Sequence, residues 1–309
     1  MKIFFTGASS FTGFWFAKTL AEAGHEVTGT FTRAGLGEYK DLYHTRTELL
    51  LPLIKPVWNC RMGSEEMLEA LGAQDYDLLC LHGAVVGNHK APDFPVMDAV
   101  QQNTLNLDEV LKVAKRAGVK SVIHTSSYFE ADTGKGTKPL EAFSPYALSK
   151  TLTWHIVRFA CYQAKMPLGK FVVANPFGPY EKGGFTTYLA KSWLAGEVPV
   201  VKSPDYVRDN VPVELMALCY LEFSKRIQAN PHANEKMDPG YFDEPQGQFA
   251  KRFSMQMHGR LESECSVRFA SQEDFSEPKI RTNSIKATSI VSDWSEDLFW
   301  DGLAAYYRC

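Results

Sequence analysis

Short apolar runs alternate with longer segments of helical period along the first part of the chain. Uninterrupted apolar runs between turn residues are typical of strands that are buried on both faces. The strands predicted from these runs span residues 2–6, 26–32, 78–84, 121–127 and 169–176. Helices are predicted over residues 12–23, 97–118 and 144–165, where apolar residues recur three and four positions apart. Repeated strand, helix, strand units predict an α/β fold with a doubly wound parallel sheet, whose ligand crevice lies at the carboxyl ends of the strands.

The pattern loosens after about Gly178, where Pro- and Gly-containing segments separate shorter elements. We therefore expect a larger domain over residues 1–177, to which some later segments return, and a smaller α/β domain in most of residues 178–309. The polar, glycine-rich segment 130–143 predicts an exposed loop.

Composition narrows the choice of ligand. The chain has 309 residues, 45% of them hydrophobic, which is long enough for a sizeable core and about two domains. A net charge of −3 offers no basic surface for nucleic acid or an anionic membrane, so we expect a small-molecule ligand.

The cysteines and the N-terminus indicate a location. Six widely spaced cysteines without a CxxC pair form neither a disulfide framework nor a zinc ligand set, which favours a reducing compartment and predicts no metal. Only three apolar residues follow Lys2, too few for a signal peptide, and no apolar run approaches the length of a membrane span. We expect a cytoplasmic protein.

The stretch "TGASSFTG", from Thr6 to Gly13, joins the first predicted strand to the first helix. A glycine-rich turn at a helix N-terminus binds pyrophosphate, because free N–H groups and the helix dipole favour the anion and the missing side chains allow close approach. Gly7 and Gly13 meet these conditions, but Ser10 stands where a middle glycine is usual. By itself the turn is equally consistent with an ordinary strand-to-helix connection.

A second signal lies in "SPYALSK", where Tyr146 and Lys150 stand four residues apart and share one helix face. An ammonium near a phenol lowers the phenol's pKa and makes it a usable proton donor or acceptor. Taken alone, such a pair is more often part of a solvated surface.

Together, the TGxxxxxG turn, the Ser126–Ser127 pair that ends a later strand and the YxxxK motif resemble the short-chain dehydrogenase/reductase superfamily. The likeness is to its extended, nucleotide-sugar-modifying branch of epimerases, dehydratases and reductases, and it runs over nearly the whole chain. Phe11 and Gly13 match the TGxxGFxG turn of that branch, whereas Ser10 departs from it. Three further segments, "LHGA", "NPFGP" and "VRDNVPVELMA", resemble cofactor- and substrate-contacting segments of the branch.

The resemblance implies a Rossmann-type dinucleotide-binding domain over residues 1–177, a substrate-binding domain in most of 178–309, and hydride transfer on a nucleotide-linked sugar. Tyr146 would exchange a proton with the sugar oxygen, Lys150 would lower its pKa and hold the nicotinamide ribose, and Ser127 would fix the substrate oxygen. The cofactor-binding residues implied are Gly7, Ser9, Ser10, Phe11, Thr12, Gly13, Thr32, Arg33, His82, Gly83, Ala84, Asn103, Tyr146, Lys150, Asn175 and Pro176. The substrate-binding residues implied are Ser126, Ser127, Asn175 and Arg208.

Several of these residues also have a plainer interpretation. His82 and His124 lie in apolar strands, and no second metal-binding residue follows either of them at the spacing of a metal site. We therefore expect them to be core histidines with hydrogen-bond partners, or histidines next to the cofactor, and not metal ligands. Arg208 suits phosphate recognition, but it could form a surface ion pair with Asp209. The aromatic cluster Phe14–Phe16 predicts helix packing.

The choice of cofactor and reaction depends on two short segments. Thr32 and Arg33 follow the second strand, with no acidic residue for the ribose hydroxyls, and a nearby arginine favours the 2′-phosphate of NADP over NAD. Tyr128 and Phe129 stand where dehydratase relatives carry an Asp-Glu pair, and Glu130 comes one place later, which argues against dehydration.

We therefore predict an oxidoreductase, namely an NADPH-dependent reductase of a nucleotide-linked keto-sugar. A nucleotide-sugar 4-epimerase, an isomerase that recycles NAD, is the alternative. A non-catalytic dinucleotide-binding sensor or scaffold, favoured only by Ser10, is the alternative of another class. Relatives often pair through two long helices, here residues 95–117 and 145–165, so we expect a homodimer.

Overall fold

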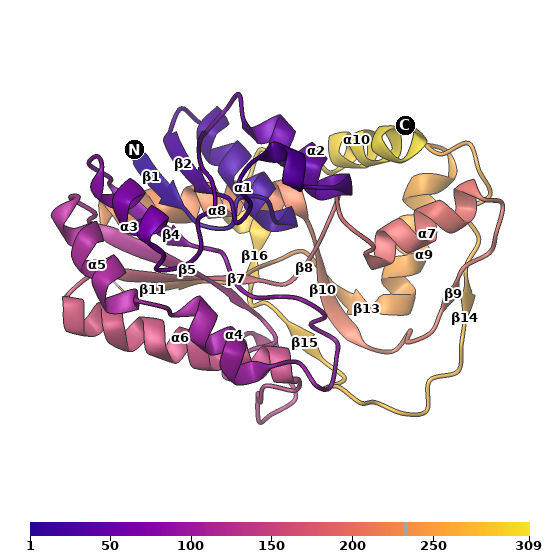
Figure 1. The fold of residues 1–309 in the computed structure, drawn as a ribbon. Coiled ribbons are helices and arrows are strands. Elements are labelled where there is room, and N and C mark those ends of the chain that lie inside the picture. Colours follow the sequence, from indigo (N-terminus) through magenta and orange to yellow (C-terminus); the bar gives the residue numbers. More distant parts are fainter. Residues whose placement is uncertain (231–233) are drawn as a thin grey trace.

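Figure 1 shows the computed structural model of the chain, which describes residues 1–230 and 234–309. The central sheet consists of β1 (Lys2–Phe5), β2 (Glu26–Thr30), β3 (Lys55–Val57), β4 (Leu78–Leu81), β5 (Ser121–Ser127), β7 (Leu168–Val173) and β11 (Glu235–Met237). All pairs in it are parallel, in the order β11-β7-β5-β4-β1-β2-β3. The strand order changes direction between β1 and β4, and the crevice outside such a switch point is where open α/β sheets bind ligands.

Helices cover both faces of this sheet (Figure 1). One face packs against α1 (Phe11–Glu22), α2 (Asp41–Leu50) and α8 (Val213–Ala229). The other face packs against α3 (Glu65–Gly72), α5 (Leu107–Arg116) and α6 (Pro145–Ala164), with α4 (Val96–Asn103) beside α6. The sheet is covered on both faces because successive side chains of a strand point to opposite sides. In β1, Ile3 and Phe5 belong to one apolar cluster and Phe4 belongs to the other. The predicted doubly wound, Rossmann-type α/β fold is confirmed.

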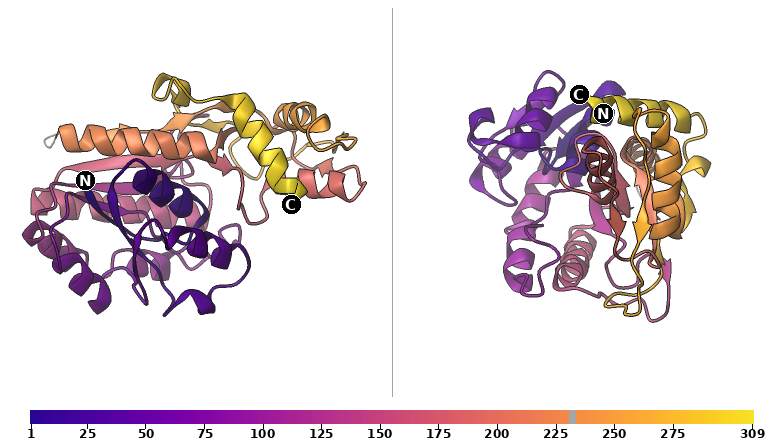
Figure 2. Two further views of the ribbon diagram at one scale, coloured as in Figure 1. Left: turned by 90° about the horizontal axis from the view of Figure 1, so that it is seen from above. Right: turned by 90° about the vertical axis from the view of Figure 1, so that its right-hand side faces the viewer.

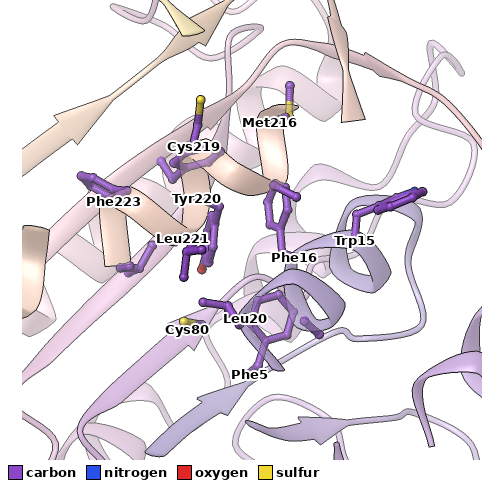
Figure 3. Packing of buried hydrophobic residues seen from close by; sticks show 14 of the residues in the cluster. Phe5, Trp15, Phe16, Leu20, Cys80, Met216, Cys219, Tyr220, Leu221 and Phe223 are labelled. Atoms are coloured by element: carbon purple, nitrogen blue, oxygen red, sulfur yellow. The ribbon is translucent and has the colours of Figure 1, made fainter. Parts of the chain in front are cut away.

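Aromatic side chains dominate the core between α1, α8 and the sheet (Figure 3). Phe16 of α1 stacks on Tyr220 of α8 with ring centroids 4.4 Å apart, and Tyr220 meets Phe5 and Phe171 edge to face. The predicted packing role of Phe14–Phe16 is confirmed, because all three side chains are buried.

The single helix predicted over residues 97–118 is wrong, because the segment forms two helices, α4 and α5. The break lies at Asn106, whose backbone is left-handed with φ 49°. Its side-chain Nδ2 donates to the Gly63 carbonyl at 2.8 Å. Gly63 permits this approach, since a Cβ there would lie 2.0 Å from the Leu105 carbonyl oxygen.

Residues after β7, apart from α8 and β11, form a second cluster of elements at the carboxyl end of the sheet (Figures 1 and 2). The helices there are α7 (Phe185–Leu194), α9 (Gln246–His258) and α10 (Glu296–Arg308), and they enclose a third apolar cluster. A three-stranded sheet runs in the order β13 (Phe242–Pro245), β10 (Val207–Pro212) and β8 (Asn175–Phe177). Two-stranded pairs join β12 (Pro239–Gly240) to β16 (Ile285–Lys286) and β14 (Arg268–Phe269) to β9 (Val200–Val201). The short helices η1 (Leu36–Glu38) and η2 (Ala287–Ser289) complete the elements.

The loop predicted to be exposed over residues 130–143 is buried where it begins. Glu130 and Thr133 have no exposed surface. Further along, β6 (Lys135–Gly136) pairs with β15 (Arg281–Thr282), which attaches the loop to the C-terminal part of the chain. No helix among residues 1–230 and 234–309 is long and apolar enough to cross a membrane.

Candidate active site

The glycine-rich turn between β1 and α1 is closely packed. A Cβ on Gly7, whose φ is +76°, would lie 2.6 Å from the Gly83 Cα. A Cβ on Gly13 would lie 2.3 Å from the Gly7 carbonyl oxygen. Both glycines are therefore required by the close approach of the turn, of α1 and of the segment after β4.

Ser10 is accommodated at the middle position without strain. It is the N-cap of α1, with ordinary extended angles of φ −70° and ψ 165°. Its hydroxyl accepts a hydrogen bond from the Gly13 N–H at 3.1 Å and donates to the Gly7 carbonyl at 3.0 Å. The side chain that replaces the usual glycine is thus used inside the turn as a helix cap.

His82 lies buried beneath this turn. Its Nε2 is 3.2 Å from both the Ser10 and the Thr12 hydroxyl oxygens, and its Nδ1 is 3.1 Å from Thr125 Oγ1. Burial, followed by the nearby Lys150 charge, lowers the pKa of His82 to about 3, so the imidazole is neutral at physiological pH. It joins α1 to β5 and matches the expected satisfied histidine next to the turn.

The first backbone N–H groups of α1 point to an anion site. The N–H groups of Phe11 and Thr12 have no hydrogen-bond acceptor among the residues that the structure describes. Unsatisfied N–H groups at a helix N-terminus bind phosphate, and the helix dipole adds to the attraction. The turn therefore fits the pyrophosphate of a dinucleotide.

Arg46 on α2 holds the turn in place through two hydrogen bonds, a role that no motif in the sequence indicates. Its buried guanidinium donates from Nε to the Ser9 carbonyl at 3.0 Å and from Nη1 to the Tyr180 carbonyl at 2.8 Å. Trp15 makes a parallel link by donating to the Pro179 carbonyl at 3.1 Å. These contacts tie the turn to the segment that follows β8.

Asn103 anchors the segment after β4, in which Gly83 and Ala84 lie. Its Oδ1 accepts from the Val85 N–H at 2.8 Å, and its Nδ2 lies 3.4 Å from the Thr153 hydroxyl of α6. The predicted cofactor-adjacent segment is thus fixed between the glycine-rich turn and α6.

The two predicted catalytic side chains on α6 share one face near the end of β5. Ser144 caps α6 by accepting from the Ala147 N–H at 3.1 Å, and Pro145 takes the first helical position. Tyr146 follows in the first turn, half-buried between the rings of His89 and Phe94, each 5.7 Å away.

Lys150, one turn later, is buried and donates from Nζ to the Thr125 carbonyl at 2.9 Å. Burial lowers the pKa of this ammonium, while the Glu130 carboxylate opposes the shift. Burial raises the pKa of Tyr146, and the Glu130 charge adds to the rise. The Lys150 ammonium therefore lies on a backbone carbonyl, and no hydrogen bond joins it to the Tyr146 hydroxyl within the described residues.

The two serines that end β5 differ in their surroundings. Ser126 is buried, and its hydroxyl has no hydrogen-bond partner among the described residues. Ser127 is partly exposed at the carboxyl end of the strand, two residues beyond the carbonyl that Lys150 contacts. Its hydroxyl oxygen accepts a hydrogen bond from the Phe129 N–H at 3.2 Å.

The other two predicted substrate residues lie on β8 and β10. Asn175 accepts a hydrogen bond from the buried Tyr128 hydroxyl at 2.7 Å, and Pro176 follows it in β8. Arg208 is buried in β10, where its Nη2 lies 2.9 Å from Glu277 Oε2 and its Nη1 donates to the Pro278 carbonyl at 3.0 Å. The alternative of a surface ion pair with Asp209 is wrong, because Asp209 accepts instead from the N–H groups of Tyr241 and Asn283.

Thr32 and Arg33 are exposed just beyond β2. The Arg33 side chain forms no ion pair with any described residue, and its carbonyl accepts from the Asn59 N–H at 2.7 Å. No group of three or more His, Cys, Asp or Glu side chains in the described ranges is placed to hold a metal ion.

The chain resembles known proteins in family and in fold. A model of the NAD dependent epimerase/dehydratase family matches residues 3–235. No curated protein matches the sequence.

Solved structures resemble the chain over its whole length. UDP-glucuronic acid 4-epimerase from Bacillus cereus, in complex with UDP-glucuronic acid and NAD, has a TM-score of 0.75 at 17% identity, covering 100% of this chain and 99% of that chain. UDP-glucose 4-epimerase from Thermotoga maritima, with UDP-glucose, gives 0.73 at 18% identity, covering 100% and 99%. dTDP-glucose 4,6-dehydratase from Streptomyces venezuelae, with NAD and TYD bound, gives 0.72 at 17% identity, covering 100% and 97%. At these identities the likeness shows a shared fold.

Proposed function

We propose that this chain, which belongs to the NAD dependent epimerase/dehydratase family, transfers hydride between a nicotinamide cofactor and a nucleotide-linked sugar. The observation that carries the proposal is the arrangement at the carboxyl end of β5. There Lys150 contacts the strand two residues before Ser127, and Tyr146 lies one helical turn away on the same helix. The anion-binding turn lies on the neighbouring elements β1 and α1 and is joined to β5 through His82.

The proposed dinucleotide site begins at the turn. The Phe11 and Thr12 N–H groups would hold the pyrophosphate, while Gly7 and Gly13 keep the backbone close. Ser9, Ser10 and Thr12 shape the turn, and His82, Gly83, Ala84 and Asn103 form the wall beyond β4. Toward the nicotinamide end we place Lys150, Tyr146, Asn175 and Pro176. Thr32 and Arg33 would meet the adenosine ribose, and a guanidinium there favours the 2′-phosphate of NADP(H).

The chemistry proposed is acid–base assistance to hydride transfer. The nicotinamide cofactor supplies the hydride when bound. Tyr146 gives its hydroxyl proton to the sugar carbonyl oxygen as that oxygen gains charge, and Ser127 donates a hydrogen bond to the same oxygen. The Lys150 ammonium stabilises the tyrosinate that forms and lowers the Tyr146 pKa once the two side chains meet around the ligand. Ser126, Asn175 and Arg208 are the proposed substrate contacts, and Arg208 suits a diphosphate.

Reduction of a nucleotide-linked keto-sugar is the reaction we favour. Tyr128 and Phe129 supply no carboxyl pair beside Ser127 such as the Asp-Glu pair of the dehydratases, which argues against dehydration. A 4-epimerase that recycles NAD is the second candidate, because two of the similar structures are 4-epimerases, one of them in complex with NAD. A non-catalytic sensor is disfavoured by the retention of Ser127, Tyr146 and Lys150 together.

We also propose that the protein is a homodimer that pairs through α4 and α6. Met97 on α4 and Phe159 and Tyr162 on α6 are 69%, 63% and 76% exposed, which is unusual for large apolar side chains. A second copy of the same face would cover them as an antiparallel helix pair.

We further propose a cytoplasmic location for this protein. The six cysteines are free thiols, which is the usual state of cysteine in a reducing compartment.

The test follows NADPH absorbance while nucleotide-linked 4-keto-6-deoxy sugars are offered as substrates. We expect decay with the wild-type protein and a loss of at least ~10³-fold in Tyr146→Phe, because the proton donor is removed. Tyr162→Phe, an exposed tyrosine on the same helix, is the matched control and should keep full activity. If no keto-sugar oxidises NADPH but a nucleotide hexose changes configuration without net cofactor use, the epimerase replaces the reductase.

A further inference from the structure

The turn that follows β5 is closed by hydrogen bonds in both directions. The Glu130 N–H donates to the Ser127 carbonyl at 3.1 Å, and the Ser127 N–H donates to Glu130 Oε1 at 2.9 Å. Between them, the Phe129 N–H donates to the Ser127 hydroxyl oxygen at 3.2 Å. The Glu130 side chain therefore bonds to the backbone of the very residue that carries the proposed substrate-binding hydroxyl.

The Glu130 carboxylate is itself held from the neighbouring strand. It is fully buried, and Lys170 Nζ on β7 lies 2.9 Å from its Oε2. Lys170 is also buried, donates to the Thr133 hydroxyl at 3.0 Å, and lies over the Trp154 ring at 4.7 Å. An ion pair removed from water in this way is weak support for stability, because desolvation opposes the Coulomb attraction. Its position at the active end of the sheet points to another use.

The hydrogen bond from Phe129 has a direct consequence for the chemistry of Ser127. A hydroxyl has two acceptor sites and one proton to donate. The Phe129 N–H occupies one acceptor site, and the hydroxyl proton is available to a ligand because it is donated to no residue that the structure describes. Ser127 is thus prepared to donate to a substrate oxygen, the role that a carbonyl under reduction requires.

We propose that Glu130 is a positioning residue, held in place by Lys170, which fixes the turn so that the Ser127 hydroxyl donates its proton to the substrate oxygen. The effect on turnover rests on the proposed function, whereas the effect on the turn does not.

A second consequence concerns charge. Burial lowers the pKa of Lys150, and the Glu130 carboxylate raises it. Glu130 therefore helps to keep the Lys150 ammonium charged in a buried place, which is the form that the proposed chemistry requires.

The first experiment reads the turn without any substrate. Hydrogen exchange of the segment 125–131, followed by mass spectrometry, should become at least ~tenfold faster in Glu130→Ala, because the acceptor of the Ser127 N–H is removed and the turn is no longer held from Lys170. Glu244→Ala is the matched control, since Glu244 is also a buried carboxylate in an ion pair, 2.7 Å from Arg252 and in the C-terminal part of the chain. The control should leave exchange in 125–131 unchanged. Unchanged exchange in Glu130→Ala would overturn the proposal.

The second experiment is a double-mutant cycle on kcat with Ser127→Ala. Glu130→Ala alone should lower kcat by ~30-fold, since a misplaced catalytic group loses up to ~10² in rate. In the Ser127→Ala background the same change should cost less than ~threefold, because the group that Glu130 positions is already gone. A loss of equal size in both backgrounds would assign Glu130 a merely structural role.

A conservative pair provides the rescue. Glu130→Gln with Lys170→Met keeps an acceptor for the Ser127 N–H and removes both buried charges together. This double variant should retain kcat within ~fivefold of wild type, whereas Lys170→Met alone leaves Glu130 uncompensated and should lose more. A double variant as slow as Glu130→Ala would contradict positioning through the hydrogen bond. If wild type turns over no nucleotide sugar at all, the proposed function fails, and the exchange experiment still decides the role of Glu130.

Discussion

Replacing Arg46 tests whether a buried cation supports the dinucleotide turn. Arg46→Leu removes two hydrogen bonds, to the Ser9 carbonyl at 3.0 Å and to the Tyr180 carbonyl at 2.8 Å. A hydrogen bond to a charged group contributes about 1.5–3 kcal/mol, which gives about 3–6 kcal/mol for the pair. Removing a buried charge also relieves its desolvation, which already lowers the Arg46 pKa. We therefore expect a net loss of about 2–4 kcal/mol in the free energy of unfolding.

The same change should weaken cofactor binding. Ser9 directly precedes the residue that caps α1, so a released Ser9 carbonyl loosens the turn that presents the Phe11 and Thr12 N–H groups. Loss of one such hydrogen bond to a phosphate, about 1.5 kcal/mol, raises the Kd by about tenfold. Urea unfolding measures the free energy of unfolding, and fluorescence titration with NADPH and NADH measures the Kd for each cofactor.

Arg116→Leu, an exposed arginine paired with Glu109 at 3.2 Å, is the matched control and should change neither quantity. If Arg46→Leu keeps both the wild-type unfolding midpoint and the wild-type Kd, the supporting role of Arg46 is refuted. A loss of stability with an unchanged Kd would restrict that role to packing.

Three further predictions concern the cofactor site and its pH dependence. Gly13→Ala should abolish NAD(P)H binding measured by fluorescence, because the new Cβ would lie 2.3 Å from the Gly7 carbonyl oxygen, and binding at wild-type affinity would contradict the packing argument. Arg33→Ala should raise the Kd for NADPH by about tenfold and leave that for NADH unchanged, since the guanidinium would contact only the 2′-phosphate; equal effects on both cofactors would count against NADP preference. The pKa of His82 is about 3 in the folded chain and 6.5 in an exposed histidine, so the unfolded chain binds the proton first and stability is lost as the pH falls below 6.5. Between pH 6.5 and about pH 4 this loss is about 3 kcal/mol. His82→Gln should therefore flatten the fall in the free energy of unfolding over this range, measured by urea unfolding at a series of pH values.

The central sheet could be predicted because its strands carry their own signal. Buried parallel strands are rich in apolar residues. β1 and β4 are apolar along nearly their whole length, and β5 and β7 contain the shorter apolar runs 122–123 and 171–173. β3 was not predicted, because this edge strand has only three residues, Lys55–Val57, and only the last of them is a strongly apolar strand former. The break between α4 and α5 escaped as well, because the apolar period continues across it and the cause, Gly63, lies far upstream.

The candidate catalytic residues could be proposed from motifs because their spacing along one strand or one helix brings them together. Tyr146 and Lys150 need only the helix period, and Ser127 needs only the strand end. Residues that act from other elements had no such signal. Arg46 and Lys170 are single cations in otherwise ordinary segments, and only the packing of α2 and of β7 gives them their partners.

Two departures from the family pattern, at Ser10 and after Ser127, each involve a partner residue that lies far away in the sequence. Ser10 replaces a glycine, and its hydroxyl is occupied by the Gly13 N–H and by His82, a residue of the segment after β4. The turn after Ser127 lacks the Asp-Glu pair of the dehydratases, and there the Glu130 side chain closes the turn and is held by Lys170. In both places the residue that departs from the family pattern contacts a buried polar side chain of another segment, namely His82 for Ser10 and Lys170 for Glu130. Each departure therefore has to be judged together with its partner, and a substitution of Ser10 or Glu130 by itself should cost more than the same change made in combination with His82 or Lys170.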